Sequence, residues 1–152
     1  LGSAFMSLGR ADEAISAFQR VLSIDGHHTQ ALAGIADAMV LKGRLDEALY
    51  YNRKALEWQP GEAKLHYNVG NILIHQGRID EAMASYREAV RLKPDYARAH
   101  NNLGSALMIR NRIDEVIDHF REAVRLDPDY RMAGENLKDA QAQKTEGRKS
   151  GR

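Results

Sequence analysis

The hydrophobic and polar positions of this chain follow the period of amphipathic α-helices. In residues 63–76, the apolar or small side chains obey the i, i+3, i+4, i+7 rule that places them on one buried helix face. They are His66, Val69, Gly70 and Leu73. A second amphipathic helix is predicted after Gly77. Its buried face consists of Ala82, Tyr86, Ala89 and Val90.

This pair of helices recurs along the chain at a fixed interval. The phrase Gly-Arg-x-Asp-Glu-Ala begins at Gly9, Gly43 and Gly77, and a variant of it begins at Asn111, always with the same spacing. The only prolines keep this spacing too: Pro60, Pro94 and Pro128. Such a period is the signature of stacked repeats. We expect helices to end near each of these glycine, asparagine and proline positions, because none of them continues a helix easily.

The period divides the chain into repeats and predicts a single domain over residues 1–144. Its parts are a partial repeat 1–28, full repeats 29–62, 63–96 and 97–130, and a capping helix 131–144. Residues 145–152 are rich in Gly, Ser, Lys and Arg and are expected to form a disordered basic tail. The chain begins at Leu1 inside a repeat, so we expect it to be part of a longer protein.

One repeat departs from the common pattern. Asn52 occupies the position that is aromatic in the other copies, where Phe18, Tyr86 and Phe120 stand. We therefore expect residues 29–62 to be the least well packed repeat.

These residues resemble the tetratricopeptide repeat (TPR) pattern, W-x2-L-G-x2-Y followed by A-x3-F and P. In residues 63–96 the matching positions are His66, Val69, Gly70, Leu73, Ala82, Tyr86 and Pro94. The resemblance covers about residues 1–130. It implies an all-α, right-handed superhelical solenoid of antiparallel helix pairs with a 34-residue period and no strand. It also implies that first helices line a concave groove and second helices lie on the convex side.

Composition excludes several classes of function. The formal charge of +1 gives no global attraction to nucleic acid or to a membrane surface. No cysteine is present, which excludes disulfides and thiolate metal sites but leaves the compartment open. No apolar run approaches the length of a membrane span.

Nothing in the sequence predicts catalysis, a cofactor or a metal site. His66 and His100 lie one repeat apart on buried helix faces, so we interpret them as core residues with the same packing role. His27 and His28 lie in a turn without carboxylates at ligand spacing. Motifs for zinc hydrolysis, nucleophilic serine catalysis and phosphate binding are missing. We therefore predict that the chain is not an enzyme.

The predicted groove carries an unusual set of polar side chains. Lys64, Asn68, Asn71 and His75 share one stripe opposite the buried face of their helix, and Arg98, Asn102 and Ser105 form the same stripe in the next copy. Asn68, Asn102 and Asn136 recur at the interval of the repeat. Asparagine is a poor helix former, so stability alone does not favour it there. The alternative is that the asparagines are inert products of duplication.

Repeated amides in a groove suggest a ladder that pairs with the backbone of an extended peptide. The segments His66-Tyr67-Asn68-Val69-Gly70 and His100-Asn101-Asn102-Leu103-Gly104 resemble O-GlcNAc transferase-type repeats, which implies such a ladder. Tyr67 and Asn101 complete the candidate peptide-binding groove. The chaperone-tail clamp of other TPR proteins is disfavoured, because Ala33, Tyr67 and Met132 stand where its cations belong.

The leading hypothesis is a non-catalytic protein-interaction module that binds an extended polypeptide, with no nucleic-acid or membrane partner. Lys64 and Arg98 would add a mild preference for acidic side chains. One alternative is a self-assembly scaffold that stacks end to end through Leu1, Phe5 and Leu8, giving a homo-oligomer. The other is the substrate-recruiting region of an enzyme, such as a glycosyltransferase, whose catalytic domain is absent.

Overall fold

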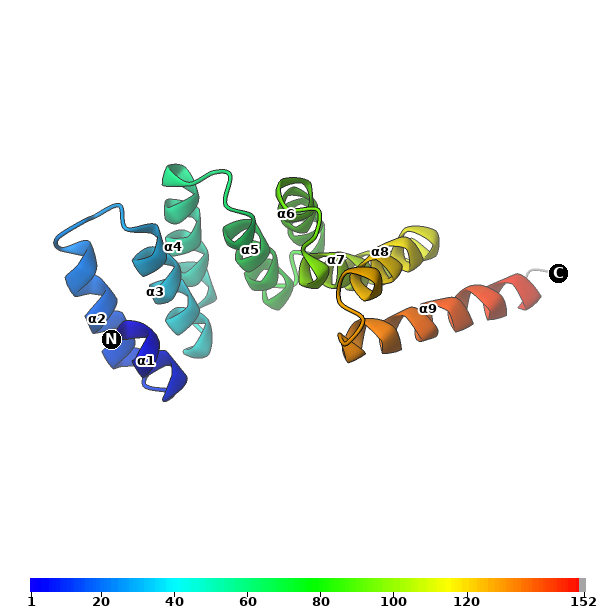
Figure 1. Ribbon diagram of the computed structural model, residues 1–152, viewed down its shortest axis with the longest axis horizontal. Coiled ribbons are helices and arrows are strands. Elements are labelled where there is room, and N and C mark those ends of the chain that lie inside the picture. The colour runs from blue at the N-terminus through cyan, green and yellow to red at the C-terminus, as the bar shows by residue number, and fades with distance from the viewer. Residues whose placement is uncertain (151–152) are drawn as a thin grey trace. The chain divides into compact units, whose positions relative to one another are not determined.

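The computed structural model describes residues 1–150, and within them every regular element is an α-helix and none is a strand (Figure 1). The helices are α1 (Gly2–Ser7), α2 (Ala11–Leu22), α3 (Thr29–Leu41), α4 (Leu45–Trp58), α5 (Ala63–His75), α6 (Ile79–Leu92), α7 (Ala97–Ile109), α8 (Ile113–Leu126) and α9 (Arg131–Ser150). The all-α prediction is confirmed. Each full copy of the repeat contributes two helices joined by a short turn.

Helices end where the sequence predicts. The turn residues Gly9, Gly43 and Gly77 have φ of 69°, 70° and 73°, and Asn111 has φ of 56°. These are left-handed conformations that glycine adopts without steric cost and that asparagine tolerates. The second helices α4, α6 and α8 each end just before a proline-containing turn. Proline disfavours helical backbone in the residue that precedes it, so the helix stops there.

Most residues of the repeated phrase have a structural role. Arg10, Arg44 and Arg112 occupy the N-cap positions of second helices without a side-chain capping bond, and each pairs with the glutamate of the same phrase. The Arg112–Glu115 pair, for example, measures 2.6 Å. The alanine that closes the phrase is completely buried in each glycine-containing copy, at Ala14, Ala48 and Ala82. The phrase therefore supplies a turn, an ion pair at the helix start and the first core contact of the second helix.

The aspartate of the repeated phrase links one repeat to the next. Asp12 pairs with Lys42, Asp46 accepts from Gln76 at 2.8 Å, Asp80 pairs with Arg110 at 2.7 Å, and Asp114 pairs with Lys144 at 2.6 Å. Every partner has the same offset from its aspartate along the chain and lies near the end of the following first helix, or at the equivalent place on α9. Such exposed pairs contribute at most about 1 kcal/mol each. They fix the register of each of these helices against the preceding second helix.

The chain divides into two compact units, unit 1 (Leu1–Arg78) and unit 2 (Ile79–Arg152), where the sequence predicts a single domain over residues 1–144. The boundary falls inside the repeat 63–96, between α5 and α6. In repeat proteins each repeat contacts only its neighbours, so a chain of this kind has no shared central core to hold it as one body. Each unit is a layer of helices packed side by side, α1 to α5 in one and α6 to α9 in the other (Figure 1).

Close packing inside the repeats depends on glycine beneath an aromatic ring. A Cβ added to Gly104 would lie 2.7 Å from the ring of Phe120, and one added to Gly2 would lie 2.6 Å from the ring of Phe18. Real Cβ atoms do not approach rings so closely, so only glycine allows this contact. Phe120 and Tyr86 are among the largest fully buried side chains of the described residues.

The repeat with Asn52 is packed differently, as its sequence suggests. Asn52 is 1% exposed, and its amide donates to the carbonyl of Ala48 at 3.3 Å. Its Oδ1 is buried and has no hydrogen-bond partner among the described residues. Ala36, fully buried, stands where Gly70 and Gly104 stand in the next two repeats, and its methyl group takes up part of the space that a ring would need.

The capping helix is longer than the sequence predicts. A helix over 131–144 with a disordered tail from Thr145 is expected, but α9 continues to Ser150; residues 151–152 lie outside the described part. Thr145 stands in the register of Gly43, Gly77 and Asn111. A β-branched residue disfavours the left-handed turn, and its hydroxyl instead donates to the carbonyl of Gln141 at 2.9 Å. The helix therefore propagates.

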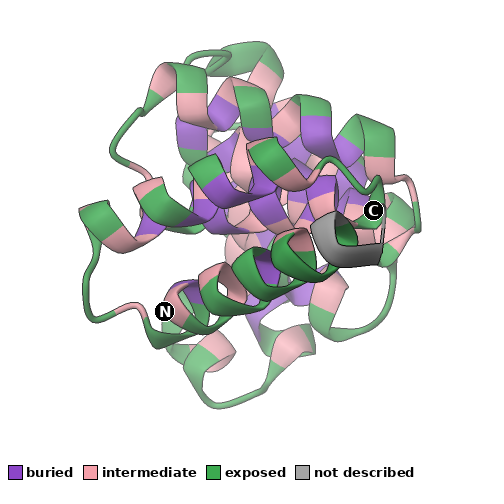
Figure 2. Cartoon of the chain, turned by 90° about the vertical axis from the view of Figure 1, so that its right-hand side faces the viewer, coloured by how far each residue is buried: buried purple, intermediate pink, exposed green. Residues whose placement is uncertain are grey.

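One face of α9 packs against α7 and α8, and the opposite face is exposed to solvent. Ala133 and Ala140 are completely buried, and Leu137 is half-buried. Most other described side chains of the helix are exposed, and the helix that ends at the C mark of Figure 2 is coloured mainly as exposed. A terminal helix with one apolar and one polar face closes the apolar side of a repeat stack.

Candidate functional site

A groove in unit 1 lies between the first helices α1, α3 and α5. It encloses a cavity of about 570 Å³, which is large enough for a side chain and part of a peptide backbone. Residues of two successive first helices line it together: Gln30, Gly34 and Asp37 of α3, and the predicted groove residues Lys64 and Asn68 of α5. The turns that precede α3 and α5 complete the wall with His28, Gln59 and Glu62.

The floor of this groove is apolar. Phe18 and Val21 of α2, Met6 of α1 and Leu65 of α5 contribute to it. Gly34 lies so close to Phe18 that an added Cβ would meet the ring at 2.5 Å. The ring is therefore covered by backbone rather than by a side chain at this point, and Phe18 remains half-buried.

The polar wall carries a carboxylate and an ammonium group. Lys64 and Asp37 are both exposed at the edge of the cavity. Burial raises the pKa of the Asp37 carboxyl above its usual value, and the positive charge of Lys64 opposes that rise. The carboxylate has lost part of its hydration without gaining an ion pair in return.

The predicted groove residues of α5 have different surroundings. Asn68 is half-buried, and its Nδ2 is buried without a hydrogen-bond partner among the described residues. Tyr67 and Asn71 are also half-buried, and both make interactions within the chain. His75 is exposed at the end of the helix. Only Lys64 and Asn68 of this set line the cavity.

In unit 2 the asparagines form a network with one another. Asn136 of α9 donates to Oδ1 of Asn101 at 3.0 Å, and Asn101 donates to Oδ1 of Asn102 at 3.2 Å. Ser105 donates to the backbone carbonyl of Asn101 at 3.1 Å. The predicted residues of α7 and α9 are therefore brought together, and Arg98 is exposed one turn before Asn102.

Asn101 does not face a groove, which differs from the sequence-based expectation. It is only 2% exposed, so it is a buried support for Asn102 and Asn136 rather than a ligand contact. The reason is its position: α9 packs over α7 and buries the side chain that precedes the stripe. The pattern of one helix does not reveal burial by another helix that comes much later in the chain.

The histidines serve as structural hydrogen-bonding groups. Nε2 of His66 lies 2.8 Å from the carbonyl oxygen of Pro60, and Nε2 of His100 lies 3.0 Å from that of Pro94. Each ring therefore fastens the turn before its own helix, a role that adds to the predicted packing. Among the described residues no group of three or more His, Cys, Asp or Glu side chains is arranged to hold a metal ion.

His100 also contacts His119 of α8, with their Nδ1 atoms 3.1 Å apart. Since Nε2–H of His100 donates to Pro94, its Nδ1 is the acceptor and His119 donates. Burial lowers the pKa of His119, and the charges of His100 on α7 and Arg87 on α6 lower it further, while Glu115 and Asp118 on α8 act in the opposite direction. Its surroundings therefore favour the neutral form of His119.

This arrangement predicts a pH-dependent stability. Because the folded-state pKa of His119 lies below its unfolded value near 6.5, the unfolded chain binds the proton more readily. Its contribution is fully present above about pH 6.5 and declines as the pH falls toward the folded-state value. We expect the melting temperature to drop between pH 7.5 and 5, and His119→Gln to reduce that drop. The exposed His75→Gln is the control, and an equal effect of both variants would contradict this role.

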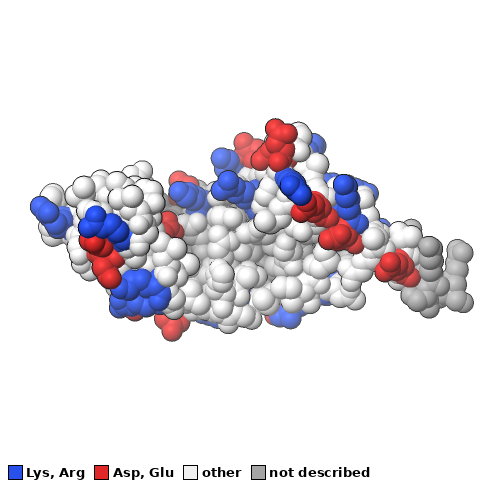
Figure 3. Space-filling view, turned by 90° about the horizontal axis from the view of Figure 1, so that it is seen from below, with Lys and Arg blue, Asp and Glu red and all other residues white. Residues whose placement is uncertain are grey.

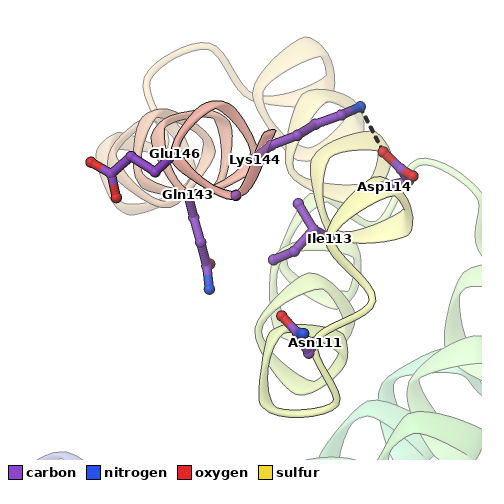
Figure 4. A pocket seen from close by; sticks show the side chains of 7 residues that line it. Asn111, Ile113, Asp114, Gln143, Lys144 and Glu146 are labelled. Atoms are coloured by element: carbon purple, nitrogen blue, oxygen red, sulfur yellow. Dashed lines mark ion pairs between the residues drawn. The ribbon is translucent and has the colours of Figure 1, made fainter. Parts of the chain in front are cut away.

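A second, polar cavity of about 520 Å³ lies in unit 2 between the α7–α8 turn and α9. Figure 4 shows Gln143 directed toward Ile113 and Asn111, Lys144 paired with Asp114, and Glu146 directed away. The groups that line it are already paired or widely open to solvent. It has no apolar floor comparable to that of the groove in unit 1.

The charged side chains give no patch of one sign on the face in Figure 3, where blue and red groups lie beside one another. Many of the ion pairs join residues three or four positions apart on one helix or at its cap: Arg10–Glu13, Arg44–Glu47, Arg91–Glu88, Arg112–Glu115, Arg121–Asp118, Arg125–Glu122 and Arg131–Glu135. No helix in the described residues combines the length and the apolar character that crossing a membrane requires.

Comparison with known protein families identifies the repeats. The description Tetratricopeptide repeat matches residues 5–67 and 97–130, and the description TPR repeat matches residues 70–109. Together these matches span nearly all of the four predicted repeats. No curated protein matches the sequence.

Several solved structures share the fold. A structure of PilF from Pseudomonas aeruginosa is 24% identical, with a TM-score of 0.90 over 96% of this chain and 67% of that one. MamA is 19% identical, with a TM-score of 0.77 over 98% and 97% of the two chains. YrrB, described as a TPR protein with an unusual peptide-binding site, is 23% identical, with a TM-score of 0.76 over 95% and 74%. At these identities the likeness concerns the fold alone.

Proposed function

This chain belongs to the tetratricopeptide repeat family, and from that premise we propose that it is a non-catalytic interaction module that binds an extended polypeptide along its first helices. The observation that carries the proposal is the groove of unit 1. There α1, α3 and α5 surround a cavity with an apolar floor and a wall of amide, carboxylate and ammonium groups. That YrrB is described as having a peptide-binding site agrees with this proposal.

The asparagines supply the backbone contacts in this proposal. Asn68 on α5 has a buried Nδ2 without a partner, and a small rotation would offer that donor to a peptide carbonyl in the cavity. In unit 2, Asn101 holds Asn102 and Asn136 in fixed orientations, which reduces the entropy that a ligand must overcome. In this proposal the three asparagines act as the amide ladder that the resemblance to O-GlcNAc transferase-type repeats implies.

Replacing Asn68, Asn102 and Asn136 together with alanine is the test. Each lost hydrogen bond costs ~0.5–1.5 kcal/mol, so binding of extended peptides should weaken about tenfold or more. Fluorescence anisotropy against a panel of labelled peptides measures the change. Arg53, Arg87 and Arg121 are exposed on the second helices and also recur once per repeat, so their triple alanine variant is the matched control.

The structure indicates that the triple alanine variant also loses stability. Alanine is the better helix former, but loss of Asn136 leaves the buried Oδ1 of Asn101 without its donor. That orphaned acceptor costs about 1–3 kcal/mol, so the triple variant should melt lower than the wild type and must be assayed well below its transition. Equal affinities of wild type and variant for all peptides would show that the asparagines are a solvated surface.

Self-assembly is the second candidate function. Leu1 and Leu8 are 83% and 69% exposed at one end of unit 1, which favours a contact there. The outer face of α9 is polar, however, and offers little apolar surface for end-to-end stacking. Light scattering over a concentration series is the measurement: a constant monomer mass would oppose the scaffold, and a rising mass that Leu8→Ser abolishes would support it.

A further inference from the structure

The ladder of asparagines is interrupted in unit 1. Positions 34, 68, 102 and 136 share one place in the repeat, and the last three hold asparagine while the first is Gly34. The ring of Phe18 fills the place that a side chain at position 34 would take. In unit 1 a ligand therefore meets Gly34 and the Phe18 ring at the repeat position that holds an amide in the later copies.

The cavity beside Gly34 has the chemistry of a side-chain pocket. The cavity of about 570 Å³ includes Gly34, with Phe18, Val21 and Met6 forming apolar floor beneath it. Phe18 is half-buried, whereas Phe120, at the same place in its own repeat, is only 1% exposed. The face of an aromatic ring attracts both aliphatic groups and cations.

A carboxylate stands at the edge of this pocket. Asp37 follows Gly34 by one helical turn and lines the same cavity. Among the described residues it makes no hydrogen bond or ion pair, and Lys64 is the only charge that acts on it. Burial raises its pKa, as expected for a carboxylate that has lost water without gaining a partner.

We propose that this pocket binds a basic side chain, arginine or lysine, of the extended polypeptide. The aliphatic stem packs on Phe18 and Val21 where an asparagine is missing, and the cationic head reaches Asp37. This inference rests on the proposed function and refines it. From the sequence, Lys64 and Arg98 suggest acidic ligands. In unit 1 Asp37 and Lys64 are both exposed and line the same cavity, and Asp37 is the one that follows Gly34 by one helical turn.

The test compares two fluorescein-labelled peptides of alternating alanine and serine that differ at one central residue. That residue is arginine in one and citrulline, its neutral isostere, in the other. For the wild type at low salt we expect the arginine peptide to bind about threefold more tightly, as for an exposed ion pair. Asp37→Asn should abolish this preference, and Lys64→Gln should increase it by removing the competing cation.

Asp139 offers a matched control. It lies in the same register on α9 as Asp37 does on α3, but Asn136 fills the ladder position beside it. Asp139→Asn removes the same charge and should leave the preference for arginine unchanged. Substitution of Gly34 is a poorer test, because any Cβ there would meet Phe18 at 2.5 Å and disturb the packing.

The outcomes separate this inference from the proposed function. If both peptides bind equally and the triple asparagine variant weakens both, the groove binds polypeptide and the pocket has no preference for a basic side chain. If Asp37→Asn and Asp139→Asn reduce the preference alike, it comes from overall charge and the assignment to this pocket is wrong. If neither peptide binds the wild type, the proposed function fails and the pocket with it.

Discussion

Deletion of residues 131–152 is expected to destabilise unit 2 by about 5 kcal/mol and to make the protein poorly soluble. The helix α9 contributes the fully buried Ala133 and Ala140, and it packs against α7 and α8, whose buried residues include Leu103, Leu107 and Phe120. Exposure of ~200 Å² of apolar surface at ~25 cal/mol per Å² gives this value. The deletion also removes the donor to Asn101 and the partner of Asp114.

The loss should be local. Because repeat proteins are stabilised by nearest-neighbour contacts, amide hydrogen exchange should accelerate in α7 and α8 while α1 to α4 stay protected. Deletion from Thr145 onward is the control, since it keeps Ala133, Ala140 and Lys144 and should melt close to the wild type. Equal melting temperatures and solubility of the two truncations would show that α9 is not a cap.

The repeat architecture was predictable because it depends on local chemistry that returns in every copy of the repeat. Left-handed backbone at Gly43 and Gly77, acidic residues in the first turn of the next helix, and a proline stop are each encoded within a few positions. The link between Asp80 and Arg110 was also readable, as opposite charges at a spacing that other repeats share, although the helix pattern alone does not draw attention to it.

What the sequence did not predict arises from contacts between helices. Asn101 reads as a groove residue on α7, and only the packing of α9 buries it. Asp37 is an exposed charge, and only the structure shows that it lines one cavity with Gly34 and Phe18. The length of α9 was misread because composition suggested a flexible tail, while the decisive feature was Thr145 in place of a turn-forming residue.

Replacing Asn52 with leucine is expected to stabilise unit 1 by about 2 kcal/mol, which for a chain of this size raises the melting temperature by roughly 4–8 °C. Asn52 is 1% exposed and its Oδ1 has no partner among the described residues, so folding removes that atom from water without compensation. Leucine fits better than phenylalanine, since Ala36 already narrows the site with a methyl group that glycine lacks elsewhere.

Thermal and urea unfolding measure this effect, with Phe120→Leu as the matched control at the same place in another repeat. That variant removes part of a well-packed ring and should lower stability, opposite in sign to Asn52→Leu.

The Asn52→Leu variant bears on Asn68 as well. Asn52 and Asn68 occupy the same two repeat positions as Phe18 and Gly34, which are in close contact. The unpartnered Oδ1 of Asn52 and Nδ2 of Asn68 are thus a matching acceptor and donor. A destabilised Asn52→Leu variant would mean that a bridging water already joins them, and that Asn68 is held by the core rather than offered to a ligand.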